Sequence, residues 1–116
     1  MRWSETEYAA YVRRGQPAPV SEKAWQACVV RLLRQYGYDY VYHTFDSRRS
    51  PSGFPDVIAC HREPGHVCYA IECKTDTGHL TPAQAAWLEA LGQCTGVVAA
   101  CWRPADLDAI VARLRS

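Results

Sequence analysis

The chain has 116 residues, of which 48% are hydrophobic and 22% are charged, a composition that suits one folded domain and excludes a disordered or fibrous protein. Its longest apolar run, residues 97–102, is too short to cross a bilayer, and the first 15 residues lack the apolar core of a secretion signal. The formal net charge of +1 does not by itself indicate a nucleic-acid-binding protein, because that inference normally starts from a strongly basic chain.

Six cysteines are present and none forms a CxxC pair. Without a secretion signal, reduced thiols in the cytoplasm are the expected state; for a phage-encoded protein this is the cytoplasm of the host. Cys60, His61, His66 and Cys68 flank one turn and are candidate zinc ligands. Their spacing matches no standard zinc motif, so ordinary hairpin residues are the alternative.

The first half of the chain predicts an N-terminal segment, a helix and a strand. Residues 1–20 form the N-terminal segment, with a short helix within residues 1–15 and a linker before the domain proper, which we expect to span residues 21–116. Ser21 is a candidate N-cap, and apolar residues then recur at helical spacing until Gly37. Alternation over residues 38–43 predicts a strand. We interpret Tyr38, Tyr40 and Tyr42 as its half-buried face, with stacking on bases as the alternative.

The second half predicts a hairpin followed by a crossover. Residues 46–53 form a polar loop, and residues 55–60 and 67–74 form two strands joined by a turn. Thr81, Pro82 and Gln84 are typical of a helix start, and that helix ends at Gly92. The apolar run at 97–102 is typical of a strand in a parallel pair, and a last helix follows. The sequence therefore predicts an α/β fold in which a mixed sheet is flanked by helices.

Five polar residues interrupt this apolar pattern. Asp56 opens the second predicted strand, and Glu72 and Lys74 end the third. Two carboxylates brought together in a partly buried place repel each other unless a proton or a cation lies between them. Lys74 supplies one positive charge, and a divalent ion held by carboxylates, a backbone carbonyl and water would supply more. Glu22 and Gln84 lie on the apolar stripes of their helices, near the N-terminal ends.

Each of these residues also has a simpler explanation. Glu22 is an acid in the first turn, where the helix dipole favours it. Gln84 closes a capping box with Thr81. Glu72 and Lys74 alone would be an ordinary charge pair on a strand end.

Three strings carry a resemblance to a known family: SGFPDV at 52–57, IECKT at 71–75 and GHLTPAQ at 78–84. In this order and at this compact spacing they resemble the VRR-NUC domain, a virus-type replication-repair branch of the PD-(D/E)XK nuclease superfamily. The similarity runs from about residue 21 to residue 114. It implies a restriction-endonuclease-like core with a mixed central β-sheet flanked by helices, in the order α-β-β-β-α-β-α.

The resemblance also implies roles for the polar residues. Asp56 and Glu72, with the Cys73 carbonyl, would bind Mg²⁺ or Mn²⁺, and Lys74 would orient the attacking water or stabilise charge on the phosphate. Gln84 would line the site, and Glu22 would complete the pocket as a further candidate ligand. Many relatives carry Lys where this chain has His79, which leaves the role of that residue open.

The expected activity is metal-dependent hydrolysis of DNA by a stand-alone DNA-repair nuclease. The expected substrate is structured DNA, a four-way junction among them, and the expected assembly is a homodimer with no membrane contact. Candidate DNA contacts are Arg48, Arg49, Ser52 and His79, although the loop before Asp56 also suits a solvated charged loop. The alternative function is a non-catalytic nucleic-acid-binding module or an accessory subunit.

Overall fold

The structure, a computed structural model, describes residues 21–44 and 51–116. It confirms the α/β class and the order α-β-β-β-α-β-α. Arg48, Arg49 and the short helix expected within residues 1–15 lie outside the described residues. The elements are α2 (Glu22–Gln35), β1 (Tyr40–His43), β2 (Val57–Cys60), β3 (Cys68–Cys73), α3 (Pro82–Gly92), β4 (Val97–Trp102), the 3₁₀ turn η2 (Pro104–Asp106) and α4 (Leu107–Arg115).

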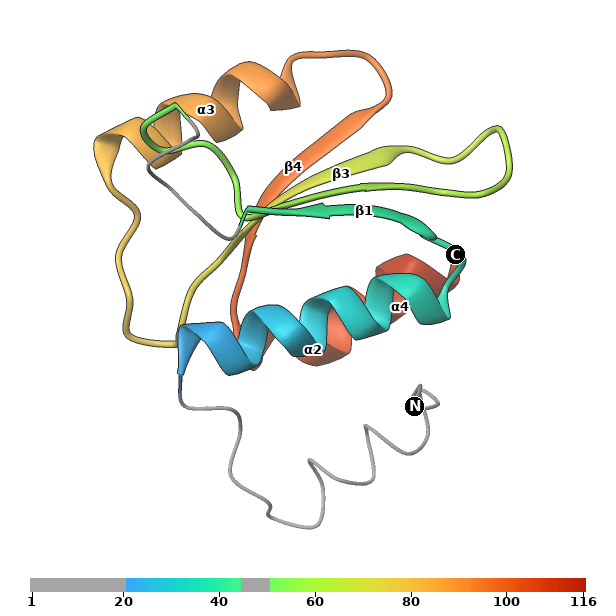
Figure 1. Cartoon of the computed structure of the whole chain (residues 1–116), viewed down its shortest axis with the longest axis horizontal. Helices are drawn as coiled ribbons and strands as arrows, with labels where there is room; N and C mark the ends of the chain where they lie inside the picture. The colour runs from blue at the N-terminus through green and yellow to red at the C-terminus, as the bar shows by residue number, and fades with distance from the viewer. Residues whose placement is uncertain (1–20, 45–50) are drawn as a thin grey trace, which may run out of the picture.

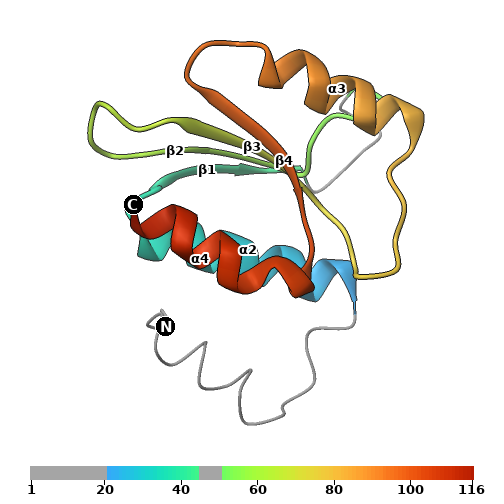
Figure 2. The ribbon, with the colours of Figure 1, turned by 180° about the vertical axis from the view of Figure 1, so that it is seen from behind.

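The four strands form one mixed sheet in the order β1-β2-β3-β4. β1, β2 and β3 pair antiparallel, and β3 pairs parallel with β4 after the crossover through α3. Helices α2 and α4 lie on one face of the sheet, and α3 lies on the other (Figures 1 and 2). Within the described ranges, no helix is long and apolar enough to cross a membrane.

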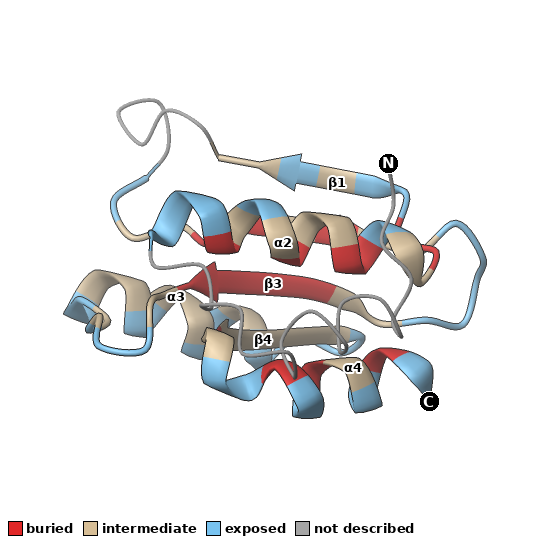
Figure 3. Cartoon of the chain, turned by 90° about the horizontal axis from the view of Figure 1, so that it is seen from below, coloured by how far each residue is buried: buried red, intermediate tan, exposed pale blue. Residues whose placement is uncertain are grey.

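The core fills the space between the sheet and helices α2 and α4. Ser21 begins α2 by accepting a hydrogen bond from the Ala24 amide on its side-chain oxygen, at 3.0 Å, and the buried side of the helix then follows the predicted stripe. Figure 3 shows the buried residues along α2, β3 and α4. Across all elements, the buried core residues include Trp25, Val29, Leu32, Leu33, Val57, Ala59, Ile71, Cys73, Trp102, Ile110 and Leu114.

One carbonyl joins three of these elements. The Trp102 carbonyl at the end of β4 accepts hydrogen bonds from the Trp25 indole at 2.8 Å and from the Lys74 amide at 3.1 Å. Both donors precede β4 in the chain, one in α2 and one just after β3. The contact fixes where β3 ends, and so it fixes the backbone next to the acidic residues.

The second and third strands are shorter than predicted. β2 begins at Val57 and β3 ends at Cys73, whereas the pattern predicted residues 55–60 and 67–74. Pro55 has no amide to contribute to the ladder, and the Asp56 side chain replaces a backbone acceptor by bonding the Cys73 amide at 2.9 Å. The Lys74 amide instead donates a hydrogen bond to the Trp102 carbonyl of β4.

The interpretation of the tyrosines as a half-buried strand face is wrong. Tyr38 precedes β1 and belongs to the core, while Tyr40 and Tyr42 are 70% and 58% exposed. The half-buried face of β1 consists of Val41 and His43. His43 hydrogen-bonds Gln26 of α2 at 2.9 Å through a ring nitrogen, so this histidine faces the helix side of the sheet.

Candidate active site

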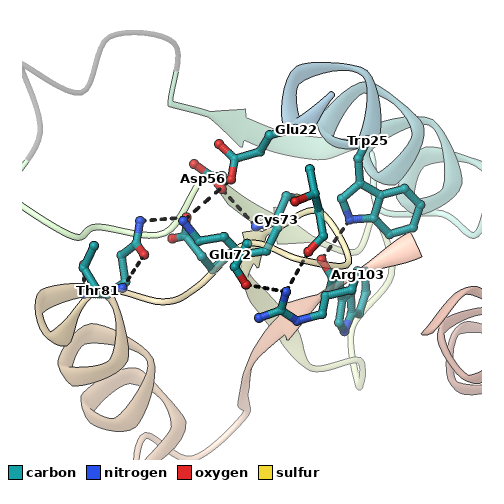
Figure 4. A network of polar contacts seen from close by, with 12 residues as sticks. Glu22, Trp25, Asp56, Glu72, Cys73, Thr81 and Arg103 are labelled. Atoms are coloured by element: carbon teal, nitrogen blue, oxygen red, sulfur yellow. Dashed lines mark hydrogen bonds and ion pairs between the residues drawn. The ribbon is translucent and has the colours of Figure 1, made fainter. Parts of the chain in front are cut away.

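Asp56 and Glu72 meet where the β2–β3 ladder ends. The register pairs Val57 with Ile71, so the next pair along an antiparallel ladder is Asp56 with Glu72. Asp56 Oδ2 accepts the Cys73 amide, which fixes its carboxylate beside β3. Figure 4 shows Glu22, Asp56 and Glu72 brought together from three parts of the chain. The expected approach of the two carboxylates is therefore present.

Lys74 and Glu22 form the outer part of the same group. Lys74 Nζ lies 3.6 Å from Glu22 Oε1, and the Lys74 side chain is only 12% exposed whereas that of Glu22 is 45% exposed. Glu22 does not enter the core that its position on the apolar stripe suggested. Glu22 lies in the first turn of α2 and forms an ion pair with Lys74, so it contacts the charged residues of the site and not the core.

Gln84 performs both of the roles that its position allowed. Its Oε1 accepts the Thr81 amide at 2.9 Å, and Thr81 Oγ1 accepts the Gln84 amide at 3.1 Å, which completes the capping box of α3. Its Nε2 donates to Glu72 Oε1 at 3.3 Å. The cap fixes the rotamer of Gln84, and that rotamer aims the amide at the carboxylate.

Glu72 is the most deeply buried ionisable side chain of the acidic residues in the site. It is 2% exposed, and its Oε2 is buried without a hydrogen-bond donor among the described residues. Burial is the main cause that raises the pKa of Glu72 to about 9, followed by a proton-sharing hydrogen bond with Asp56 and the charge of Asp56, against a smaller opposing effect of Lys74. Without a cation, this carboxyl holds a proton at neutral pH.

An open cleft of about 700 Å³ lies at the three acidic residues and Gln84, whereas Lys74 and Cys73 do not line it. Among the predicted residues, Glu22, Ser52, Asp56, Glu72 and Gln84 line it. His79 is exposed on the segment between β3 and α3 and does not line the cleft, so its contact with DNA stays a prediction. Lys23, Gln26, His43, Thr44, Pro51, Gly53 and Phe54 complete the lining.

The chain as a whole is similar to known proteins. A model of the VRR-NUC domain family matches residues 9–102, most of the chain. The chain belongs to the VRR-NUC family. It is similar to a solved structure described as a VRR_NUC domain protein, with a TM-score of 0.58, 20% sequence identity, and coverage of 83% of this chain and 86% of that one. None of the curated proteins matches it.

The donor set of this VRR-NUC chain fits a hard divalent cation. Two carboxylates stand side by side, and when both are ionised, Glu72 Oε2 is buried without a hydrogen-bond donor among the described residues. A buried acceptor without a partner is costly, and a cation would satisfy it and neutralise the repulsion between the two groups. Asp56 and Glu72 are therefore the residues that would hold the ion.

The segment that contains the Gly-Phe-Pro-Asp string of this VRR-NUC chain lines the cleft and packs against α3. The Trp87 indole donates to the Ser52 carbonyl at 3.1 Å, and the Phe54 ring lies edge-on to Trp87 with centroids 5.2 Å apart. Gly53 has φ +83 and touches the backbone of Ala83. No prediction from the sequence included this contact with Trp87; the available signal was Gly53, two residues before Pro55.

Gly53→Ala is expected to destabilise the fold by about 2–5 kcal/mol. The new Cβ would lie 2.5 Å from the Ala83 carbonyl carbon, which adds overpacking to the strain of a positive φ. Gly65→Ala is the matched control, because Gly65 has φ +89 with nothing within 4 Å of a Cβ and loses only about 1–2 kcal/mol to strain. Chemical denaturation measures both, and equal losses would contradict the close packing.

Arg103 holds the segment between β3 and α3. Its Nη1 donates to the Thr75 and Gly78 carbonyls, both at 2.6 Å. A Cβ on Gly78 would lie 3.5 Å from Lys74 Cδ, so the same segment packs along the aliphatic part of the lysine. No prediction from the sequence included Arg103. We interpret it as a positioning residue for Lys74.

Arg103→Ala is expected to lower kcat about tenfold with little change in KM, because a displaced lysine slows the reaction more than it weakens DNA binding. Arg113→Ala is the control: Arg113 donates to the Tyr69 hydroxyl at 3.2 Å, and neither residue lines the cleft. Steady-state kinetics separate the two variants. Equal kcat values for Arg103→Ala and Arg113→Ala would contradict the positioning role.

The four candidate zinc residues do not form one site. Cys60 and Cys68 face each other with their sulfur atoms 3.2 Å apart, on the sheet face opposite the core. His61 and His66 stack with centroids 3.6 Å apart, next to the core residue Tyr38. His61 Nε2 contacts the Tyr36 carbonyl at 3.0 Å, and Nδ1 accepts the Glu63 amide at 3.0 Å. The ligand atoms of His61, Glu63 and His66 lie within 4.8 Å of one another, without a cysteine among them.

Proposed function

We propose that this VRR-NUC protein is a divalent-metal-dependent nuclease that hydrolyses phosphodiester bonds in DNA. The observation that carries the proposal is the Glu72 oxygen that is buried beside Asp56 without a donor among residues 21–44 and 51–116. That arrangement is unfavourable in a purely structural charge pair, and it is what a cation site requires. Membership of a nuclease-type family supports the same conclusion.

Asp56 and Glu72 would hold Mg²⁺ or Mn²⁺, and the Cys73 carbonyl is the third proposed ligand. The amide of Cys73 points to Asp56, and in an extended strand the amide and carbonyl of one residue point to the same side, which supports that choice. When bound, the ion supplies Lewis-acid polarisation of the phosphate and a more acidic water.

Lys74 is the proposed group that orients the attacking water or stabilises charge on the phosphate. The Lys74 side chain is only 12% exposed, and low exposure strengthens the electrostatic effect of its charge, because water screens it little. Glu22 holds the ammonium from the open side. The presence of Asp56, Glu72 and Lys74 together argues for turnover and against the alternative of a non-catalytic binding module.

Structure-selective cleavage, including that of a four-way junction by a homodimer, is part of the proposal. A junction is resolved by two opposed cuts, and each chain supplies one candidate site, so two copies would be required. Arg48, Arg49, Ser52 and His79 are the proposed backbone contacts. Among them, Ser52 lines the cleft.

A cleavage panel tests the proposal. Linear duplex, single strand, flap, splayed arm and four-way junction are each incubated with Mg²⁺ or Mn²⁺, beside an EDTA control and the Lys74→Ala variant. We expect metal-dependent cleavage that is strongest on a branched substrate and absent in the variant. Cleavage that is equal in EDTA or in Lys74→Ala would refute the assignment, and light scattering that shows a monomer on DNA would refute the dimeric junction mechanism.

A further inference from the structure

Two tyrosines on β1 stand out on the surface of the protein. Tyr40 is 70% exposed and Tyr42 is 58% exposed, and they are the large hydrophobic side chains that are exposed among the described residues. Positions on the open face of an edge strand are commonly polar. Large aromatic side chains in such positions mark a candidate binding surface.

The register places the tyrosines on the same sheet face as Glu72. Tyr42 pairs with Ile58, and Ile58 pairs with Ala70; residues paired across strands face the same side. Glu72 lies two residues beyond Ala70 on β3 and so shares that face. Helices α2 and α4 cover the opposite face (Figure 1).

β1 also leads directly into the cleft. His43 ends the strand, and the Thr44 amide donates to the Asp56 carbonyl at 2.8 Å. Thr44 lines the cleft that contains Asp56 and Glu72, and His43 lines the same cleft from the helix side of the sheet. A polymer lying along the outer face of β1 would therefore pass from Tyr40 to Tyr42 and then reach the acidic pair.

The spacing of the two rings suits a nucleic-acid strand. Residues i and i+2 of an antiparallel strand are about 6.8 Å apart. Bases stacked along one strand lie about 3.4 Å apart, so one base fits between two rings that are about 6.8 Å apart. A base held between two rings has left the stack of its neighbours, which an unpaired base does more readily than a paired one.

We propose that Tyr40 and Tyr42 bind an unpaired stretch of the substrate by stacking on its bases and hold it in line with the cleft. This inference rests on the proposed nuclease function and narrows its substrate to DNA with a single-stranded part beside the cut. Tyrosine suits the role because its ring stacks on any base while its hydroxyl stays in water.

A second copy of the chain is the competing occupant of this face. Two tyrosines bury about 300–500 Å² together, whereas a stable dimer buries about 800 Å² on each partner. The tyrosine pair alone is therefore too small for a stable subunit contact. Its continuity with the cleft favours the nucleic acid.

Fluorescence anisotropy with EDTA present measures binding in the absence of cleavage. The probes are a labelled 12-nucleotide oligothymidylate and a labelled 12-base-pair duplex. The test protein carries Tyr40→Thr and Tyr42→Thr, since threonine keeps the strand propensity, and the matched control carries Tyr40→Phe and Tyr42→Phe, which keep the rings. We expect the threonine pair to weaken oligothymidylate binding at least about tenfold, the phenylalanine pair to change it less than about twofold, and duplex binding to change little in both.

Each other outcome overturns the inference. Unchanged oligothymidylate binding by the threonine pair excludes stacking, and an equal loss in the phenylalanine pair assigns the contact to the hydroxyls. A wild-type dimer that becomes a monomer only in the threonine pair, measured by light scattering, assigns the face to a second copy. Circular dichroism verifies that each variant is folded.

The inference and the proposed nuclease function fail separately. Tyrosine-dependent binding of oligothymidylate by a wild-type protein that cleaves nothing with Mg²⁺ or Mn²⁺ would remove the nuclease function and keep the stacking surface. Metal-dependent cleavage together with oligothymidylate binding that does not depend on the tyrosines would keep the nuclease function and remove the stacking surface.

Discussion

Asp56→Asn is expected to lower metal-dependent cleavage about a hundredfold or more while the chain stays folded. The amide oxygen of the introduced asparagine can still accept the Cys73 amide bond that Asp56 Oδ2 accepts at 2.9 Å, so the end of the β2–β3 ladder is preserved. The negative charge beside Glu72 is lost, and with it half of the carboxylate pair that would hold a cation. Single-turnover cleavage rates and Mn²⁺ titration calorimetry measure the two effects.

Asp39→Asn is the matched control for this substitution. Asp39 is also an aspartate that makes a defined contact, an ion pair with Arg62 at 3.3 Å, but it does not line the cleft. Its cleavage rate is expected to stay within about twofold of wild type, in line with the small contribution of exposed ion pairs. A wild-type rate in Asp56→Asn, or an equal loss in Asp39→Asn, would contradict the site.

Divalent-metal affinity is expected to rise about tenfold per pH unit between about pH 5 and pH 8. Burial and Asp56 raise the pKa of Glu72 to about 9, so over this range a cation must displace the shared proton in order to bind. Calorimetry with Mn²⁺ in buffers of different ionisation enthalpy measures both the affinity and the proton released. In Glu72→Gln the slope is expected to vanish together with most of the affinity, and a flat profile in the wild-type protein would contradict the buried carboxyl.

The same proton is expected to make the metal-free protein less stable as the pH rises. The carboxyl of Glu72 is protonated in the folded chain up to about pH 9 but ionised in the unfolded chain above its ordinary value of 4.5. The unfolded state therefore binds fewer protons in this window, and the free energy of unfolding falls by about 1.4 kcal/mol per pH unit. Urea denaturation at several pH values measures the free energy of unfolding of wild type and Glu72→Gln. The fall with pH is expected in wild type and is expected to disappear in the variant.

The order of elements was predictable because periodicity survives in a single sequence. The stripe from Trp25 to Leu33 and the apolar run at 97–102 each match one kind of element. The approach of Asp56 and Glu72 was predictable for a related reason: the strands that carry them are adjacent in the chain and form a hairpin. Local pattern was sufficient for both.

The side of β1 that packs on the core was not predictable from alternation alone. Tyr40 and Tyr42 alternate with Val41 and His43, and both sets contain residues that can be buried. Alternation defines two faces but does not say which one a helix covers. The structure decides it through the contact of His43 with Gln26 of α2.

The other features of the site that were not predictable depend on contacts between residues far apart in the chain. Arg103 holds carbonyls 25 and 28 residues earlier in the sequence, and Glu22 meets Lys74 from another element. No periodicity or spacing rule connects such positions. Gln84 shows why two explanations of one residue need not exclude each other, because one rotamer closes the helix cap and contacts Glu72.

The hydrogen bonds to the Trp102 carbonyl have a consequence for the order in which a ribosome delivers the chain. The ribosome adds Trp102, whose carbonyl is the acceptor, 77 residues after Trp25, whose indole is the donor. All acidic residues of the cleft are synthesised before Trp102. A nascent chain that has not yet reached β4 has these carboxylates but lacks the parallel partner that fixes the end of β3. We therefore expect translation to pass residue 102 before the cleft is complete, so that a product of premature termination would lack the finished site.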